Sequence, residues 1–153
     1  MCETMVKTGR KTQPNRIAIC GSMTFLSNME ILAHKLSMLG YQPNTPVPEE
    51  ENLDWDELPT AKAIALKKQF LSGYFETIRE SDIVLIANFK KHGVDGYIGA
   101  NTLMEAACGY ALHKPVYLLF APGSQNCRLE ALAIASGVLE GDLAGLPPLD
   151  AIV

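Results

Sequence analysis

The sequence predicts an α/β domain built around a parallel sheet of about five strands, with helices on both faces. Two continuous apolar runs, 82–88 and 114–120, are rich in aliphatic and β-branched residues, as are strands buried inside parallel sheets. An amphipathic helical pattern occupies residues 60–80. Strands that alternate with helices form right-handed βαβ units, and these units give a parallel sheet covered on both faces.

The first strand is predicted at 16–20, where an apolar run is closed by the turn residues Gly21 and Ser22. A helix follows through residue 39, because apolar side chains recur at helical spacing and Gly40 stands where a terminal glycine ends a helix. Residues 41–47 are a short extended segment whose two prolines indicate an edge strand.

The rest of the chain continues the alternation after an acidic, proline-bounded segment. That segment, residues 48–59, is predicted to be an exposed loop or a short irregular turn, with a lid as a further interpretation. The following elements are a helix at 60–80, a central strand at 82–88, a glycine-bearing loop at 89–100, a helix at 101–113, a strand at 114–120, a weaker helix at 127–136 and a short strand at 138–140.

Composition predicts a single globular domain at 16–153 after a disordered polar tail at 1–15. The chain has 153 residues, of which 48% are hydrophobic and 20% charged, enough for one sizeable core. The formal net charge of -4 argues against a nucleic-acid or anionic-membrane surface, since both select clustered Lys and Arg. Residues 1–15 lack the apolar core of a signal peptide, so we expect a cytoplasmic protein.

Neither a metal nor a cofactor is expected from the sequence. The cysteines are scattered without a C-x-x-C pair, and the histidines have no zinc-ligand spacing. We therefore interpret the cysteines as reduced thiols and the histidines as structural or solvated. These residues are Cys2, Cys20, Cys108 and Cys127, and His34, His92 and His113.

Glu105 is the candidate centre of chemistry, because it is the only formal charge in the apolar run 96–112. An ionised carboxylate is rarely buried without a partner or a function. One interpretation is structural: Thr102 and Glu105 fit the T-x-x-E capping box. The other places Glu105 in the first helical turn, where the macrodipole favours the charged form that a nucleophile or cation stabiliser needs.

A sugar anomeric carbon is the natural target of such a carboxylate, because its oxocarbenium-like transition state is positive. Gly93, Gly96 and Gly99 would let backbone N–H groups approach a ligand closely. Asn101 and Thr102 would bond sugar hydroxyls. Ligands of parallel sheets bind outside the carboxyl ends of strands, where the strand order reverses. The segments expected at that edge are 21–23, 88–101 and 121–124.

Three segments, Ser81–Asn88, Asp95–Glu105 and Tyr110–Leu119, resemble the nucleoside 2-deoxyribosyltransferase family and its nucleotide N-hydrolase relatives. The resemblance implies a flavodoxin-like (Rossmann-like) three-layer sandwich that acts on a small nucleoside or nucleotide. It also implies a homo-oligomer whose neighbouring subunits complete the active site, with the 60–80 helix as a possible interface or simply part of the core.

The resemblance also implies the roles of two acids. Glu105 occupies the place of the family's nucleophile, ahead of a Lys-Pro strand start. Asp82, which opens the central strand, occupies the place of the second catalytic acid, which orients the glutamate or handles a proton on the leaving base. An ordinary boundary residue between helix and strand explains Asp82 as well.

Each implied substrate contact has a structural alternative. The turn from Gly21 to Met23 would cradle the sugar 5′ group, or would only join strand to helix. Tyr97 would stack on the base, or would be an exposed loop residue. Asn88 and Asp95 would hold the leaving base, and a loop role explains Asp95 equally.

Two departures from the family pattern leave alternatives open. The aspartate that often precedes the glutamate is missing from 99–102, and Met23-Thr24 stand where the monophosphate hydrolases carry an arginine, so a 5′-phosphate is left undecided. The sequence predicts cleavage of an N-glycosidic bond by transfer to a base or to water. A non-catalytic nucleotide or sugar-nucleotide sensor is the alternative, and a phosphoribohydrolase of the "lonely guy" type, whose motif residues 99–105 loosely match, ranks below it.

Overall fold

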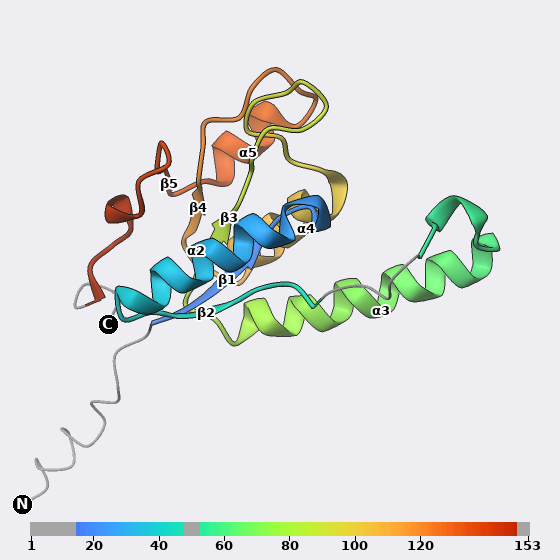
Figure 1. The fold of residues 1–153 in the computed structure, drawn as a ribbon, viewed down its shortest axis with the longest axis horizontal. Helices are drawn as coiled ribbons and strands as arrows, with labels where there is room; N and C mark the ends of the chain where they lie inside the picture. The colour runs from blue at the N-terminus through green and yellow to red at the C-terminus, as the bar shows by residue number, and fades with distance from the viewer. Residues whose placement is uncertain (1–14, 48–52, 150–153) are drawn as a thin grey trace, which may run out of the picture.

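The computed structural model describes residues 15–47 and 53–149, and its centre is a five-stranded sheet in which every paired strand is parallel. The strand order is β2-β1-β3-β4-β5 (Figure 1). The strands are β1 (Arg16–Cys20), β2 (Gln42–Asn44), β3 (Ile83–Ile86), β4 (Val116–Leu118) and β5 (Gly137–Val138). The predicted α/β sandwich with a parallel sheet of about five strands is confirmed.

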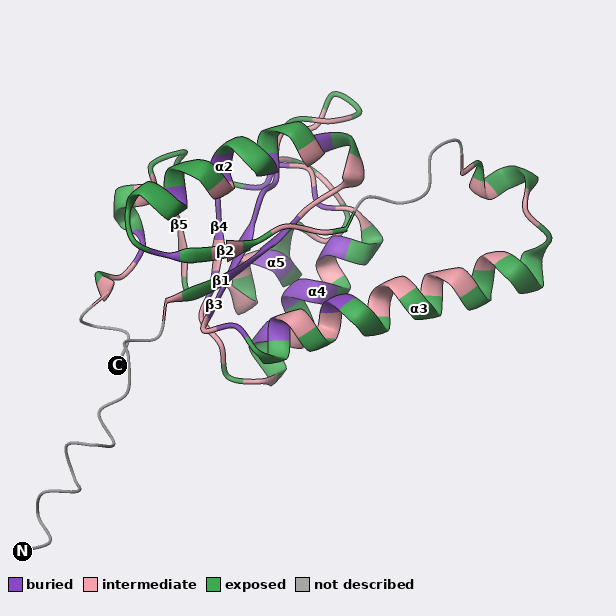
Figure 2. Cartoon of the chain, turned by 60° about the horizontal axis from the view of Figure 1, so that its bottom comes forward, coloured by how far each residue is buried: buried purple, intermediate pink, exposed green. Residues whose placement is uncertain are grey.

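Helices cover both faces of this sheet, and its central strands β1, β3 and β4 are largely buried (Figure 2). The 3-10 turn η1 (Met23–Phe25) and α2 (Leu26–Met38) lie on one face. Three helices lie on the other: α3 (Thr60–Arg79), α4 (Ala100–Ala111) and α5 (Arg128–Ile134). Along β1, Ile17 and Ile19 pack toward α2 while Ala18 and Cys20 pack toward α3 and α4, as the period of two in a strand requires.

The predicted end of the first helix is confirmed, and parts of the predicted tail and of the acidic segment lie outside the described residues. Gly40 has a φ of +100° just beyond α2, the left-handed conformation expected of a terminal glycine. Of the predicted tail, residues 1–14 lie outside the described residues, and Asn15 donates a side-chain hydrogen bond to the Gly40 carbonyl at 3.0 Å. Of the acidic segment, 48–52 lie outside, and a short 3-10 turn, η2 (Trp55–Glu57), follows.

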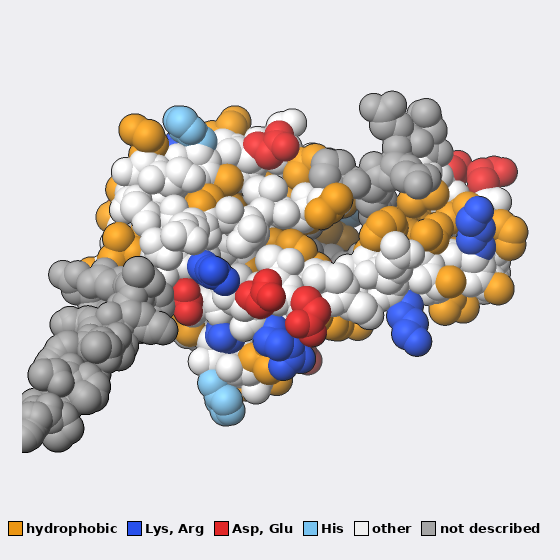
Figure 3. Space-filling model, turned by 90° about the horizontal axis from the view of Figure 1, so that it is seen from below, with side chains coloured by type: hydrophobic (Ala, Val, Ile, Leu, Met, Phe, Trp, Pro, Cys, Tyr) orange, Lys and Arg blue, Asp and Glu red, His pale blue; other side chains and the backbone are white. Residues whose placement is uncertain are grey.

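Helix α3 is 20 residues long, and its amino-terminal part extends away from the body of the molecule (Figure 1). Hydrophobic side chains gather over this extension, and the surface is hollowed where it meets the body (Figure 3). Trp55 of η2 packs edge-to-face on Phe70 of α3, with ring centroids 6.2 Å apart. The extension of α3 thus forms one wall of a cavity.

The strand order reverses between β1 and β3, because the chain passes from β1 to β2 on one side and then returns to β3 on the other. Such a switch point is where ligands bind in open α/β sheets. Gly21 follows β1 there in a crowded position: a Cβ atom would lie 3.0 Å from the Ala87 carbonyl oxygen and 3.1 Å from Met29 Sδ. The glycine lets the chain turn at once from β1 into η1.

One further turn, η3 (Leu143–Gly145), follows β5 and packs on the α2 side of the sheet. Within residues 15–47 and 53–149, none of the helices is both long and apolar enough to cross a membrane.

Candidate active site

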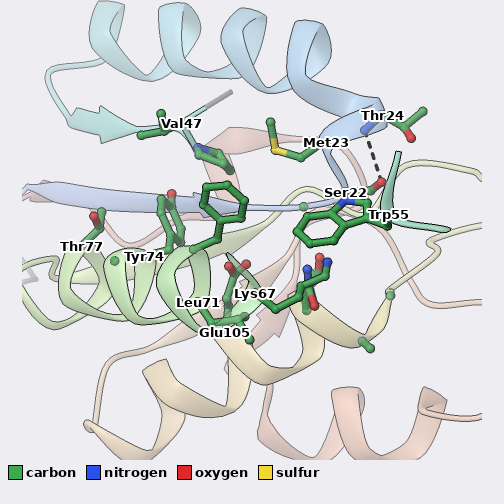
Figure 4. A pocket seen from close by; sticks show the side chains of 18 of the residues that line it. Ser22, Met23, Thr24, Val47, Trp55, Lys67, Leu71, Tyr74, Thr77 and Glu105 are labelled. Atoms are coloured by element: carbon green, nitrogen blue, oxygen red, sulfur yellow. Dashed lines mark hydrogen bonds between the residues drawn. The ribbon is translucent and has the colours of Figure 1, made fainter. Parts of the chain in front are cut away.

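A cavity of about 850 Å³ opens at the carboxyl ends of β1 and β3 (Figure 4). This volume is within the usual range of about 300–1,000 Å³ for small-molecule sites. Its walls come from the turn after β1, the end of β2, η2, α3, the loop after β3 and the start of α4. The lining residues that carry the description below are Gly21, Ser22, Met23, Trp55, Lys67, Phe70, Tyr74, Lys91, Tyr97, Gly99, Asn101, Thr102 and Glu105.

Glu105 forms the floor of this cavity and is the sole carboxylate among its described lining residues. Figure 4 shows the side chain rising from α4 toward the cavity, with Trp55 and Tyr74 around it. Helix α4 begins at Ala100 after Gly99, so Glu105 lies in the second turn. The predicted placement in the first turn is therefore wrong.

The capping-box interpretation is wrong as well. Gly99 occupies the N-cap position of α4, where the described residues supply no side-chain capping bond. Thr102 lies inside the first turn and is 97% buried, with a relative exposure of 3%. The carboxylate of Glu105 is consequently left facing the cavity instead of its own backbone.

Burial sets the protonation of Glu105. The residue is only 9% exposed, and desolvation raises the pKa of its carboxyl group from 4.5 to about 7. A hydrogen bond from the Cys20 thiol acts in the opposite direction and lowers this pKa. The sequence-based expectation that the helix dipole keeps the group charged is corrected: the dipole acts within the first turn, and burial dominates here.

Lys91 brings a positive charge to the opposite wall. Its Nζ donates a hydrogen bond to Ser22 Oγ at 2.8 Å and lies 5.7 Å from the centroid of the Tyr97 ring. Ser22 Oγ in turn accepts a hydrogen bond from the Thr24 backbone N–H at 3.3 Å. These contacts fix a lysine ammonium and a serine hydroxyl beside the turn after β1.

A second cation, Lys67, and the ring of Trp55 form the outer wall. Lys67 Nζ lies 4.3 Å from the centroid of the Trp55 ring, a cation–π contact. Deeper in the cavity, the Tyr74 hydroxyl donates to the carbonyl oxygens of Ile19, at 2.5 Å, and Asn44, at 3.1 Å. This shared hydrogen bond ties α3 to β1 and to the end of β2, and it holds the cavity wall in place.

Most of the predicted site residues meet in this cavity. Those that line it are Gly21, Ser22, Met23, Tyr97, Gly99, Asn101, Thr102 and Glu105. They come from two of the three segments expected at this edge of the sheet, the turn after β1 and the stretch from the β3 loop into α4.

Asp82 lies elsewhere. It precedes β3 and therefore stands at the amino edge of the parallel sheet, opposite the cavity. Its Oδ2 accepts a hydrogen bond from the Arg16 backbone N–H at 3.0 Å, which joins the starts of β1 and β3. The prediction of Asp82 as a second catalytic acid finds no support in this position, and the structural interpretation fits it.

Asn88 and Asp95 are also outside the cavity lining, which gives no support to their predicted contact with the base. The buried Asn88 side chain accepts from the Phe120 N–H at 3.0 Å and donates to the Phe120 carbonyl at 2.7 Å. The Asp95 side chain is 80% exposed and pairs with Lys90 at 3.8 Å. Asn88 joins the β3 and β4 loops, and Asp95 is a surface residue.

The third expected segment, 121–124, braces the β3 loop. Gly96 has a φ of +60°, and a Cβ there would lie 2.3 Å from the Ala121 carbonyl oxygen. Gln125 Oε1 accepts from the Ile98 N–H at 2.9 Å, and its Nε2 donates to the Gly96 carbonyl at 2.9 Å. Gly96 is thus required for loop packing, and it is Gly99 that lines the cavity.

Sequence reasoning missed the residues Lys91, Lys67, Trp55 and Phe70. The sequence places Lys91 in a predicted loop and Lys67 on the polar side of a predicted helix, where lysines are usually solvated, and Trp55 lies in the acidic segment. Their position at the site depends on how far α3 extends past the sheet, which local periodicity does not encode. A tryptophan in an otherwise polar segment was the one usable signal. Within 15–47 and 53–149, His, Cys, Asp and Glu form no cluster suited to a metal ion.

Comparison with known proteins shows a likeness in fold but not in sequence. No protein-family model and no curated protein sequence matches the chain. Among solved structures, the chain is similar to a 2-deoxyribosyltransferase from the psychrotolerant bacterium Bacillus psychrosaccharolyticus, with a TM-score of 0.57 and 20% sequence identity. The match covers 87% of this chain and 96% of that one. The chain therefore has the fold of that 2-deoxyribosyltransferase.

Proposed function

We propose that this protein cleaves the N-glycosidic bond of a nucleoside or nucleoside monophosphate and passes the (deoxy)ribosyl group to another base or to water. The observation that carries this proposal is Glu105, a single buried carboxylate at the floor of a cavity of nucleoside size. The shared fold with a 2-deoxyribosyltransferase supports the same class of reaction.

The proposed reaction has two displacements at the anomeric carbon. Ionised Glu105 attacks this carbon, the bond to the base nitrogen breaks, and its electron pair leaves with the base, which takes up a proton from solvent. The resulting glycosyl ester is then attacked by a second base or by water, which gives its proton to solvent as the ester bond to Glu105 breaks. Glu105 ends the cycle as a carboxylate.

A single carboxylate suits an N-glycoside better than an O-glycoside. Glycosidases that release an alcohol use two acidic residues, because one of them must protonate the poor leaving oxygen. A heterocyclic base leaves more readily, since its ring delocalises the electron pair. Among the described lining residues Glu105 has no acidic companion, which favours a leaving group of the second kind.

The two lysines of the cavity favour an anionic ligand. Lys91 is held beside Ser22, where the sequence left recognition of a 5′-phosphate undecided, and Lys67 stands on the outer wall. A phosphate oxygen accepts charge-assisted hydrogen bonds from an ammonium and a hydroxyl. We therefore propose that Lys91 and Ser22 hold the 5′ end of the sugar and that monophosphates are preferred to nucleosides.

The test is incubation of the purified protein with matched nucleosides and nucleoside 5′-monophosphates, in ribo and deoxy forms, with and without an acceptor base. Chromatography measures the released base and any new nucleoside. We expect release from at least one deoxy or ribo substrate and none with Glu105→Gln. Tight binding without release by the wild type would contradict the proposal and favour a sensor. Release by both proteins would remove Glu105 from the mechanism.

A further inference from the structure

A tight two-residue turn carries Lys91 in the loop after β3. The Lys91 N–H donates to the Val94 carbonyl at 3.1 Å, and the Val94 N–H donates to the Lys91 carbonyl at 2.9 Å. Between them, His92 and Gly93 have φ values of +54° and +73°, the positive pair that a hairpin turn of type I′ requires. The backbone of Lys91 is therefore fixed, and the place of its long side chain depends on the groups around it.

The ring of Tyr97 is one of two groups that hold this side chain. Lys91 Nζ lies 5.7 Å from the ring centroid, within the distance of about 6 Å over which an aromatic ring attracts a cation. The same ammonium donates a hydrogen bond to Ser22 Oγ at 2.8 Å. None of the ion pairs among the described residues involves Lys91. The ammonium is therefore placed by a hydroxyl and an aromatic ring, and not by a carboxylate that would neutralise it.

The Tyr97 ring is itself fixed by its neighbours. Its backbone N–H donates to the Phe89 carbonyl at 3.1 Å, and the ring meets that of His92 edge-to-face, with centroids 5.3 Å apart. A Cβ added at Gly99, the N-cap residue of α4, would lie 3.4 Å from the Tyr97 hydroxyl oxygen and 3.5 Å from its Cε2 atom. The ring thus contacts both the turn that carries Lys91 and the start of the helix that carries Glu105.

We propose that Tyr97 is a positioning residue that acts through Lys91: its ring holds the ammonium beside Ser22 and so gives the cavity its preference for a 5′-monophosphate over the nucleoside. The proposal rests on the proposed function, because it assigns a cause to the phosphate preference inferred there.

The geometry lets the ring hold the charge and leaves the hydrogen-bond donors available. An ammonium has three N–H donors, of which one is engaged by Ser22. At 5.7 Å the ring attracts the charge without accepting a hydrogen bond from it. Two donors of Lys91 therefore remain for phosphate oxygens. Without the ring, the lysine side chain would gain rotamer freedom that phosphate binding must then remove.

This role differs from the stacking on the base that the sequence suggested for Tyr97. A ring that stacks on the base contributes to the binding of nucleoside and monophosphate alike. A ring that acts through Lys91 contributes only when the ligand carries a phosphate. The two roles are therefore separated by comparing ligands that differ in the phosphate alone.

The experiment compares Tyr97→Leu, which removes the aromatic ring, with Tyr97→Phe, which keeps it. Tyr110→Leu is the matched control, because Tyr110 is exposed on α4 and lies outside the cavity lining. Every protein also carries Glu105→Gln, so that no ligand is consumed. Calorimetry measures the Kd for adenosine, 2′-deoxyadenosine and thymidine and for the 5′-monophosphate of each.

We expect Tyr97→Leu to weaken the binding of monophosphates about three- to tenfold and to leave that of nucleosides unchanged. Tyr97→Phe and Tyr110→Leu should bind both kinds of ligand like the parent protein. In the Lys91→Met background, Tyr97→Leu should cause no further loss, because the ring acts through the ammonium.

Several outcomes would overturn the proposal. These are a parent protein that binds monophosphates no more tightly than nucleosides, an equal loss for both kinds of ligand in Tyr97→Leu, and a loss that persists in full in the Lys91→Met background. If Tyr97→Leu does not fold, pentafluorophenylalanine in place of Tyr97 keeps the shape of the ring and withdraws its π electrons. Monophosphate affinity equal to that of Tyr97→Phe would then overturn the proposal.

The binding readout needs no turnover, so the two proposals fail separately. Absence of base release by the wild type, together with the expected binding losses, would remove the proposed function and leave the Tyr97–Lys91 pair as a phosphate site. Base release by the wild type, together with identical monophosphate affinities in Tyr97→Leu and Tyr110→Leu, would keep the function and remove Tyr97 from it.

Discussion

Replacing Glu105 by glutamine separates the catalytic cost of this residue from its structural cost. The substitution keeps the shape of the side chain and removes its charge. If Glu105 is the nucleophile, base release should fall by about three orders of magnitude or more. At the same time the folded protein should become more stable at alkaline pH, because a carboxylate is no longer confined in a desolvated site.

The size of this stabilisation follows from the pKa of Glu105. Its carboxyl group has a pKa of about 7 in the folded protein against 4.5 when unperturbed. Between these values the folded chain keeps a proton that the unfolded chain has released, so the free energy of unfolding falls as the pH rises from about 4.5 to 7. The full loss above pH 7 is about 3 kcal/mol. Glu105→Gln does not titrate and avoids this loss.

Urea unfolding of the wild type and the variant at pH 4 and pH 8 measures the effect, with equal m-values required for the comparison. We expect the stability of Glu105→Gln relative to wild type to rise by about 3 kcal/mol between the two pH values. The control is Glu30→Gln, because Glu30 is exposed on α2, on the other face of the sheet. If the difference in free energy of unfolding between Glu105→Gln and wild type does not change with pH, the conclusion that ionisation of buried Glu105 destabilises the folded protein is refuted.

Further predictions address the pH profile, the anionic ligand, the packing of α4 and assembly. Because the nucleophile must be ionised, kcat/KM should rise with pH through about 7; a profile that falls across this range would point to Glu105 as an acid. Lys91→Met should raise the KM for a nucleoside monophosphate about ten- to hundredfold and leave that for the nucleoside nearly unchanged. Gly109→Ala should cost about 1–3 kcal/mol in urea unfolding, because its Cβ would lie 2.6 Å from Val84 Cγ2. Gly73→Ala, with nothing within 4 Å of the added carbon, should instead stabilise α3 by about 0.5–1 kcal/mol. The homo-oligomer implied by the family resemblance stays a prediction, which light scattering of the purified protein checks.

The sheet was predictable because each central strand is a short local run of apolar residues in the sequence. The run at 83–86 is four consecutive β-branched or aliphatic residues, all buried between helices in the structure. The helix after β1 could be bounded because Gly40 ends it with a positive φ. Helix α4 begins at Ala100 after the N-cap Gly99, whereas the capping-box interpretation starts it after Thr102, so Glu105 lies in the second turn instead of the first. That shift changed the electrostatics expected of Glu105.

The site was predictable where it depends on strand ends and not where it depends on helix length. Gly21 follows β1 directly, and Glu105 lies near the start of α4, to which the loop after β3 leads, so topology brings them together. Asp82 precedes a parallel strand, which places it at the opposite edge, and this rule could have been applied to the sequence. Trp55 and Lys67 reach the cavity only because α3 extends beyond the sheet.

The central claim is that Glu105 forms a bond to the sugar, and mass spectrometry of the acid-quenched protein during turnover tests it most directly. The account predicts an added glycosyl mass on the peptide that contains Glu105, and its loss when an acceptor base is supplied. A glycosyl group on a different residue, or undiminished cleavage by Glu105→Gln, would contradict it.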